Sequence, residues 1–325
     1  MNRRDAILVL ASLGIAPITL AQRPSKPARI GILVFGSPEG SGPFVDAFKL
    51  GMRELGYSEG TSVTYDIRWA SGRPERLPAL AKELVSLNPD VIWTGAPETA
   101  LAVQSASIAI PIVAGDTGGD AVRSGLAKSL ARPGGNITGF AAIYDDYSAK
   151  LLELLLGVEP KPALVAILRN PASPTVTNLE SLQTAAARMG VSLLTLEARN
   201  PAQIEDAFRR MIEARVSGAI LLGGPMFFQQ RPLIAELALS SRVPTIYPIR
   251  VFVDAGGLMS YGAHLSDNYR RSATYVDRIL KGANPGDLPI QQSTKFELVI
   301  NLKTAKAIGV TIPQSLLLRA DEVIQ

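Results

Sequence analysis

The stretch Ser129-Leu130-Ala131-Arg132-Pro133-Gly134-Gly135-Asn136-Ile137-Thr138-Gly139 lies between two halves of the chain that repeat the same order of strands and helices. Pro133 restricts the preceding residue to an extended conformation and ends any helix there. Gly134 and Gly135 permit the positive φ angles of a sharp turn, and we predict that at least one of them adopts such an angle. We interpret the stretch as a hinge crossover between two lobes. The alternative is an ordinary loop that contains proline and glycine.

Apolar runs and helical periodicity alternate on both sides of this stretch. Residues 30–35 form a continuous apolar run, which is typical of a strand buried on both faces of a parallel sheet. After a loop of small residues at 36–43, apolar side chains recur at helical spacing up to Gly56. The same order restarts after Gly139 and continues to Pro248. Such alternation predicts βαβ units, so we expect an α/β fold with two Rossmann-like lobes and parallel sheets.

The composition indicates a folded globular protein and excludes several kinds of chemistry. The chain has 325 residues, of which 47% are hydrophobic and 19% charged, which suits two α/β domains. It has no cysteine, which excludes disulfides, thiol nucleophiles and a lipid-modified cysteine. His264 is the single histidine, so a multi-histidine metal site is excluded, and we expect His264 to cap or pack at an element end. The net charge is +4 without a lysine- and arginine-rich run, so we expect no nucleic-acid surface.

The N-terminus has the pattern of an export signal. Arg3 and Arg4 form a basic region, and residues 6–20 form an apolar region that is too short to span a membrane. Thr19-Leu20-Ala21 reads as a cleavage site, so residues 1–21 are predicted to be a signal peptide and the mature chain to begin at Gln22. We therefore expect a periplasmic protein, by the general secretory or the twin-arginine route. The alternative is an N-terminal helix docked on the core.

The loops that follow the strands hold the candidate ligand-binding residues. Ligands of doubly wound sheets bind beyond the carboxyl ends of the strands. These loops are rich in small and polar residues at helix N-termini, where backbone N–H groups favour a carboxylate or another anion. For any single loop, the alternative is plain strand-to-helix turn chemistry. The candidate residues are Ser37, Pro38, Thr94, Gly95, Ala96, Asp116, Thr117, Tyr144, Asn170, Thr175, Gly223 and Tyr247.

Within this set we assign different groups of the ligand to the two lobes. We expect the anionic end to bind around Ser37, Thr94 and Ala96, and Asp116 either to pair with an ammonium group or to cap the helix after it. The second lobe would close over the apolar end through Tyr144, Asn170, Thr175 and Tyr247. The sequence has no phosphate-binding loop, no dinucleotide fingerprint and no G-x-S-x-G elbow. We therefore expect no cofactor, no metal and no catalytic residue.

Several longer segments carry a resemblance to a known family. The chain resembles the periplasmic substrate-binding proteins of ABC transporters, in particular the family with tryptophan- and tyrosine-binding members. At residues 120–122 it departs from the family's usual Asp-Pro-Val, because Ala121 replaces the proline. The segments that match are Phe48-Lys49-Leu50-Gly51-Met52-Arg53-Glu54-Leu55-Gly56-Tyr57, Ile110-Pro111-Ile112-Val113, residues 129–139, Asn170-Pro171, Gly257-Leu258-Met259-Ser260-Tyr261-Gly262, residues 279–289 and Lys295-Phe296-Glu297-Leu298-Val299-Ile300-Asn301-Leu302-Lys303-Thr304-Ala305.

The resemblance implies a type I periplasmic binding fold, with a three-crossover hinge and a ligand in the cleft between the lobes. We expect lobe 1 to comprise residues 28–139 and 263–290, and lobe 2 residues 140–262 and 291–325. The implied function is that of the extracytoplasmic solute-binding component of an ABC importer. The solute would be a small carboxylate-bearing molecule such as an amino acid, and the partner an inner-membrane ABC permease. We expect a monomer.

Two other functions remain open at this point. The protein would act as a sensor if its closed form were presented to a membrane receptor rather than to a permease. An enzyme that uses the cleft is the third alternative, although the sequence shows no pair of nucleophile and base.

Overall fold

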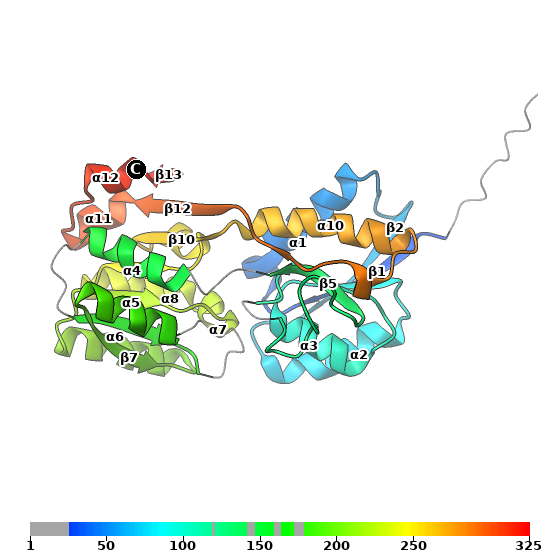
Figure 1. Cartoon of the computed structure of the whole chain (residues 1–325), viewed down its shortest axis with the longest axis horizontal. Coiled ribbons are helices and arrows are strands. Elements are labelled where there is room, and N and C mark those ends of the chain that lie inside the picture. Colours follow the sequence, from blue (N-terminus) through cyan, green and yellow to red (C-terminus); the bar gives the residue numbers. More distant parts are fainter. Residues whose placement is uncertain (1–25, 119–120, 142–146, 159–163, 172–178) are drawn as a thin grey trace, which may run out of the picture.

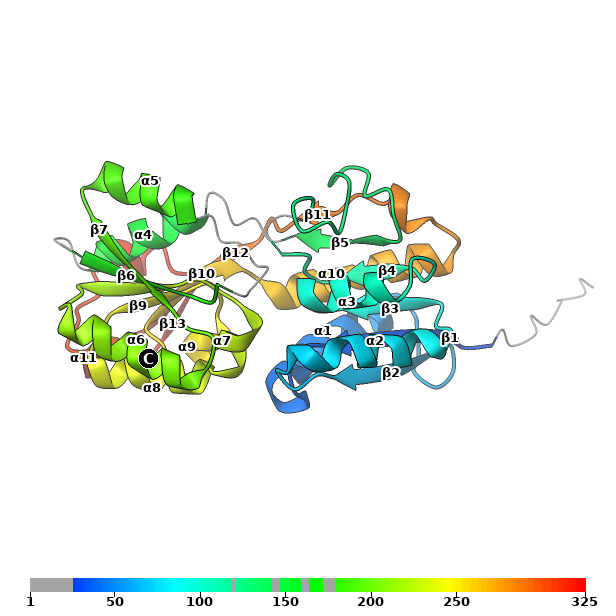
Figure 2. The ribbon, with the colours of Figure 1, turned by 90° about the horizontal axis from the view of Figure 1, so that it is seen from below.

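The computed structural model describes residues 26–118, 121–141, 147–158, 164–171 and 179–325. The predicted signal peptide, Tyr144 and Thr175 lie outside these residues. Figures 1 and 2 show two lobes side by side along the long axis of the molecule, with the chain passing between them at the centre.

The first lobe is a parallel sheet covered by helices on both faces. Its strands run in the order β11 (Gln291–Gln292), β5 (Ile137–Ala141), β4 (Ile112–Ala114), β3 (Val91–Thr94), β1 (Ala28–Val34) and β2 (Val63–Trp69). One core contains residues of α1 (Pro38–Glu54) and α10 (Leu265–Leu280), and the core on the other face contains residues of α2 (Leu77–Ser86) and α3 (Pro97–Ala106). Two short 3₁₀ helices, η1 (Pro74–Arg76) and η2 (Pro285–Asp287), complete the lobe.

The second lobe has a mixed sheet. Its strand order is β13 (Glu322–Ile324), β12 (Phe296–Asn301), β10 (Met259–Ala263), β9 (Thr245–Tyr247), β8 (Gly218–Leu221), β6 (Leu164–Arg169) and β7 (Ser192–Glu197), with β10 and β12 antiparallel. Residues of α4 (Tyr147–Val158), α5 (Leu179–Met189), α11 (Leu302–Ile308) and α12 (Gln314–Leu317) share one core. Residues of α6 (Pro201–Glu213), α7 (Pro225–Gln229), α8 (Arg231–Ser241) and α9 (Val251–Asp254) share the other.

Side chains at the N-cap position of several helices accept hydrogen bonds from backbone N–H groups that a helix start leaves free. Ser37 Oγ accepts the Gly40 N–H at 3.3 Å at the start of α1, and Asn200 Oδ1 accepts the Gln203 N–H at 3.0 Å at the start of α6. His264 Nδ1 accepts the Asp267 N–H at 3.1 Å at the start of α10. The prediction that the single histidine caps an element is therefore confirmed.

The chain passes between the lobes three times, as the family resemblance implies. β5 leads from the first lobe toward α4, β10 leads from the second lobe back to α10, and β11 leads by residues 293–295 to β12. The three predicted boundaries are displaced by one or two residues, since β5 ends at Ala141, β10 ends at Ala263, and β11 pairs with β5 in the first sheet. An extended segment was predicted at residues 288–294, where β11 lies, but its two exposed glutamines give no indication of the sheet that it joins.

The predicted position of the hinge is wrong. The Pro-Gly-Gly segment is part of a loop that precedes β5, and the Gly134 N–H donates to the Gly286 carbonyl of η2 at 3.0 Å. β5 itself belongs to the first sheet, so the chain crosses to the second lobe only after Ala141. Proline and glycine signal a turn, but they do not show whether the flanking elements belong to one sheet or two. The predicted positive φ angle is confirmed at Gly134, where it is 70°.

This geometry predicts a modest, local effect of substitution in the loop. We expect Gly134→Ala to lower the free energy of unfolding by about 1 kcal/mol, because an L-residue is strained at that φ angle. Gly135 has no positive φ angle and open space around a Cβ atom, so Gly135→Ala is expected to change stability little. Chemical denaturation of both variants measures the difference. Equal effects of the two substitutions would contradict the assignment of strain to Gly134.

Candidate ligand-binding site

A small cavity of about 70 Å³ lies between the lobes, next to the ends of β1 and β3. The first lobe supplies most of its walls, and α7 of the second lobe closes it with Phe228 and Gln229. Figure 1 shows α7 on the side of the second lobe that faces the first. The residues around the cavity are Val34, Phe35, Gly36, Ser41, Phe44, Val45, Trp93, Gly95, Ala96, Phe228, Gln229 and Tyr269.

Aromatic side chains form a fixed wall of this cavity. Trp93 stacks on Phe48 with ring centroids 4.8 Å apart, and Tyr269 meets Trp93 edge to face at 5.5 Å. The Trp93 indole N–H donates to Ser272 Oγ at 2.8 Å, and the Tyr269 hydroxyl donates to the Gly95 carbonyl at 2.9 Å. These hydrogen bonds orient both rings, so the wall offers a preorganised surface to an apolar or aromatic group.

The predicted residues at the ends of β1 and β3 have different environments. Gly95 and Ala96 line the cavity, as the sequence predicts for this strand end. Ser37 is half-buried and caps α1, and Pro38 is exposed. Ligand contact by Ser37 and Pro38 stays a prediction.

Three further predicted residues of the first lobe are buried. The hydroxyl groups of Thr94 and Thr117 make no hydrogen bond to another described residue. Asp116 Oδ1 accepts the Gly118 N–H at 2.8 Å, which stabilises the turn after β4. The carboxyl edge of the first sheet therefore holds polar groups in a region of low solvent access.

The second-lobe candidates are less closely grouped. Asn170 and Gly223 are half-buried and follow β6 and β8. Tyr247 is fully buried and stacks on Phe252 with ring centroids 5.0 Å apart, so it is a residue of the core and not of the cavity. The sequence placed Tyr247 at a strand end, but it gave no information on which face of the sheet the ring covers.

Glu98 lies in the first turn of α3, just after the cavity-lining Gly95 and Ala96, and it was not among the residues predicted from the sequence. The loops after β1 and β3 share a pattern, Gly36-Ser37-Pro38-Glu39 and Gly95-Ala96-Pro97-Glu98, that places a glutamate in the first turn of each helix. Glu39 is exposed, and hydrogen bonds from its own backbone N–H and from the Ser37 hydroxyl lower its pKa. Burial raises the pKa of Glu98 to about 7, and the nearby Asp116 charge acts in the same direction.

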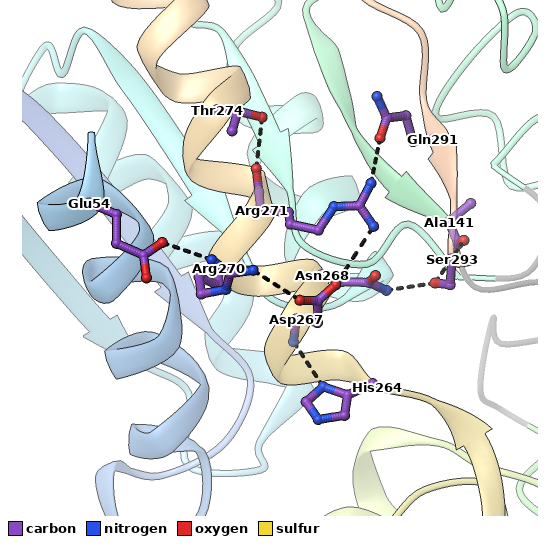
Figure 3. A network of polar contacts seen from close by, with 10 residues as sticks. All are labelled: Glu54, Ala141, His264, Asp267, Asn268, Arg270, Arg271, Thr274, Gln291 and Ser293. Atoms are coloured by element: carbon purple, nitrogen blue, oxygen red, sulfur yellow. Dashed lines mark hydrogen bonds and ion pairs between the residues drawn. The ribbon is translucent and has the colours of Figure 1, made fainter. Parts of the chain in front are cut away.

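A hydrogen-bonded network joins the three crossovers (Figure 3). The Asn268 side-chain amide donates to Ser293 Oγ at 2.6 Å, and the Ser293 N–H donates to the Ala141 carbonyl at 3.0 Å. The His264 N–H donates to the Lys295 carbonyl at 3.1 Å. The ends of all three connections are thus held together, which suits a pivot between two rigid lobes.

A larger cavity of about 480 Å³ lies beside α1, α8, α9 and the crossover at His264. Arg250 in its wall is already paired with Asp254 and Glu322. Helices and a crossover line most of this cavity, whereas the smaller one adjoins the carboxyl ends of two parallel strands. We place the candidate site at the smaller cavity because ligands of this architecture bind at strand ends.

The two-lobed α/β architecture and the cleft at the strand ends agree with a known family. A family model described as ABC transporter substrate binding protein matches residues 29–324. The chain belongs to this family. Proteins of the family bind small solutes outside the cytoplasm and deliver them to a membrane permease, and they are not enzymes.

Three relatives show how far the similarity extends. A tyrosine-binding protein of Clostridioides difficile (strain R20291) is 23% identical over 273 residues, which are 82% of this chain and 77% of that protein. The crystal structure of an ABC domain in complex with L-Trp from Streptococcus pneumonia is 25% identical with a TM-score of 0.85, covering 92% of this chain and 100% of that one. A conserved domain protein of Vibrio cholerae O1 biovar eltor is 27% identical with a TM-score of 0.85 and the same coverage.

These findings confirm the type I periplasmic binding fold that the resemblance implied. Among the described residues, no helix combines the length and the apolar composition that a membrane crossing requires.

Proposed function

We propose that this substrate-binding protein serves an ABC importer and binds a small carboxylate-bearing amino acid, with an aromatic side chain, between its lobes. The partner would be an inner-membrane permease and the location the periplasm, after removal of residues 1–21. The observation that carries the proposal is the oriented aromatic wall of the cavity, formed by Phe44, Trp93 and Tyr269.

The aromatic wall supports the choice of ring. The protein from Streptococcus pneumonia was crystallised with L-Trp, and the relative from Clostridioides difficile is a tyrosine-binding protein. Aromatic rings prefer offset or edge-to-face contact with other rings, which contributes about 0.5–1.5 kcal/mol beyond the burial of area. From the sequence, the apolar end of the ligand was expected to contact the second lobe, whereas this wall favours contact with the first lobe.

The start of α3 supports the choice of a carboxylate. Ala96 precedes the helix, and its side chain has no oxygen with which to cap the helix. The Thr99 side chain accepts the Ala96 N–H at 3.2 Å and Pro97 has no N–H, so the attraction for an anion here comes from the helix dipole and not from these two backbone groups. An anion at this helix start gains from the helix dipole by about 0.3–1 kcal/mol.

The lobes have to separate for such a solute to bind. The cavity of about 70 Å³ is several times smaller than the roughly 300–1,000 Å³ of a small-molecule site. A ligand would therefore bind to an open form and stabilise the closed one through contacts to both lobes.

Isothermal titration calorimetry of the mature chain tests this proposal. We expect L-tryptophan or L-tyrosine to bind in the micromolar range or tighter, and L-alanine to bind far more weakly because it lacks the ring. Trp93→Leu is expected to weaken binding of the aromatic amino acid at least tenfold. Binding of sugars alone, or equal binding of alanine and tryptophan, would contradict the proposal.

A further inference from the structure

Glu98, in the first turn of α3, has no hydrogen-bond or ion-pair partner among the other residues that the structure describes. Both of its carboxylate oxygens are buried, and neither makes a hydrogen bond to another described residue. The ion pairs of the described residues do not include it. A buried carboxylate without a counter-charge is unfavourable. Its position therefore favours a cation that arrives from outside the chain.

The first turn of α3, which carries Glu98, lies next to the cavity. Cα–Cβ bonds in a helix tilt toward the N-terminus, so a side chain of the first turn lies over the start of the helix. Gly95 and Ala96 immediately precede α3, and both line the cavity between the lobes. The end of the helix that carries Glu98 is thus the end that meets the cavity.

Asp116 brings a second carboxylate to the same place. It follows β4, the neighbour of β3 in the sheet, and it is buried. A Cβ atom on Gly118 would lie 3.4 Å from Pro97 Cγ, so the turn that contains Asp116 packs on the start of α3. The Asp116 charge also raises the pKa of both Glu98 and Tyr269, so Asp116 lies near Glu98 and near one residue of the cavity wall, Tyr269.

We propose that Glu98 and Asp116 together bind the ammonium group of the solute. This inference rests on the proposed function, because it names the residues that recognise one group of the amino acid. An ammonium group donates three hydrogen bonds and supplies the positive charge that the Glu98 carboxylate lacks. A divalent metal fits less well, since the described residues include no cluster of three or more side chains suited to hold one.

Matched ligands with and without the amine test the inference. L-Tryptophan is compared by calorimetry with indole-3-propionate, and L-tyrosine with 3-(4-hydroxyphenyl)propionate, so that ring and carboxylate are constant within each pair. We expect the amino acid to bind at least tenfold more tightly than its amine-free analogue. Glu98→Gln and Asp116→Asn should each weaken binding of the amino acid at least tenfold and leave binding of the analogue unchanged or tighter.

Glu39→Gln is the matched control, because Glu39 occupies the same helix position in α1 but is exposed. It is expected to leave both affinities unchanged. If Glu98 affects only the stability of α3, Glu98→Gln will change the affinity for the amino acid and the affinity for its analogue by the same factor. If the amino acids bind but the two variants match the wild type, the ammonium site is wrong and the proposed function stands.

An ammonium ion without a ring or a carboxylate tests the cation site independently of the proposed function. Ethylammonium chloride should raise the melting temperature of the wild type more than sodium chloride at equal ionic strength, and Glu98→Gln should abolish the difference. If no amino acid binds and ethylammonium still acts in this way, the proposed function fails and the cation site stands. If neither the amino acids nor ethylammonium has an effect, both proposals are overturned.

Discussion

Gly51→Ala is expected to destabilise the first lobe strongly. Gly51 lies in α1 where α10 packs against it, and a Cβ atom there would approach the Arg270 carbonyl oxygen to 2.0 Å. The Ala273 Cβ would lie at 2.9 Å. The backbone of α10 cannot rotate away as a side chain can, so the two helices have to move apart. Overpacking of this kind costs about 1–3 kcal/mol or more. We expect the upper part of that range.

The measurement is thermal and chemical unfolding of the substituted chain. A loss of about 3 kcal/mol would lower the melting temperature by roughly 5–10 °C. Gly42→Ala is the matched control in the same helix, because a Cβ at Gly42 meets no atom within 4 Å. That substitution should be neutral or stabilise by about 0.5–1 kcal/mol, owing to the higher helix propensity of alanine. If both variants unfold alike, the close contact of α1 with α10 is not a determinant of stability.

The alternation of strands and helices could be predicted because it depends on local patterns. A strand covered by helices on both faces has to be apolar throughout, as in residues 30–35, and this signal needs no knowledge of distant contacts. The return of the tail to both lobes was expected from the family resemblance, with its three-crossover hinge. The position of the hinge was not predicted correctly, because Pro133-Gly134-Gly135 produces the same turn whether or not the following strand belongs to the first sheet.

The cavity was predicted only in part, and for a related reason. α7 has five residues, which is too few for helical periodicity, so its Phe228 and Gln229 were not recognised as part of the site. Trp93 has the apolar pattern of a core strand, and its second role as a wall of the cavity depends on the turn of α10 that carries Tyr269. Contacts between segments far apart in the chain are absent from local patterns.

Glu39 and Glu98 also show that local sequence patterns do not predict the burial of a single side chain. Both follow proline in the first turn of a helix after a parallel strand, and local rules predict the same helix-stabilising role for each. One is exposed and the other is covered at the edge of the first lobe. Burial in the tertiary structure, which local sequence does not predict, makes the negative charge of Glu98 destabilising, whereas the charge of the exposed Glu39 stabilises the fold.

We expect this difference to appear as a pH-dependent gain in stability of Glu98→Gln in the absence of ligand. The pKa of Glu98 rises from 4.5 to about 7 on folding, chiefly through burial, with Asp116 as the described charged group that adds to it. The folded chain therefore binds this proton more tightly than the unfolded chain. The contribution of Glu98 to the free energy of unfolding therefore falls as the pH rises from 4.5 to about 7, by up to roughly 3 kcal/mol, and does not change further above that pH.

Glutamine removes the charge and keeps the size of the side chain. Below pH 4.5 the wild type is already protonated at Glu98, so the variant should gain little there. At pH 8 it should be about 1–3 kcal/mol more stable, the lower values reflecting the cost of burying an amide. Unfolding curves at pH 4, 6 and 8 measure the trend. Glu39→Gln should show no gain at pH 8, because the pKa of Glu39 is lowered and its charge favours the folded chain. If Glu98→Gln has the same relative stability at all three values, the Glu98 carboxylate is not buried in solution as the structure shows it.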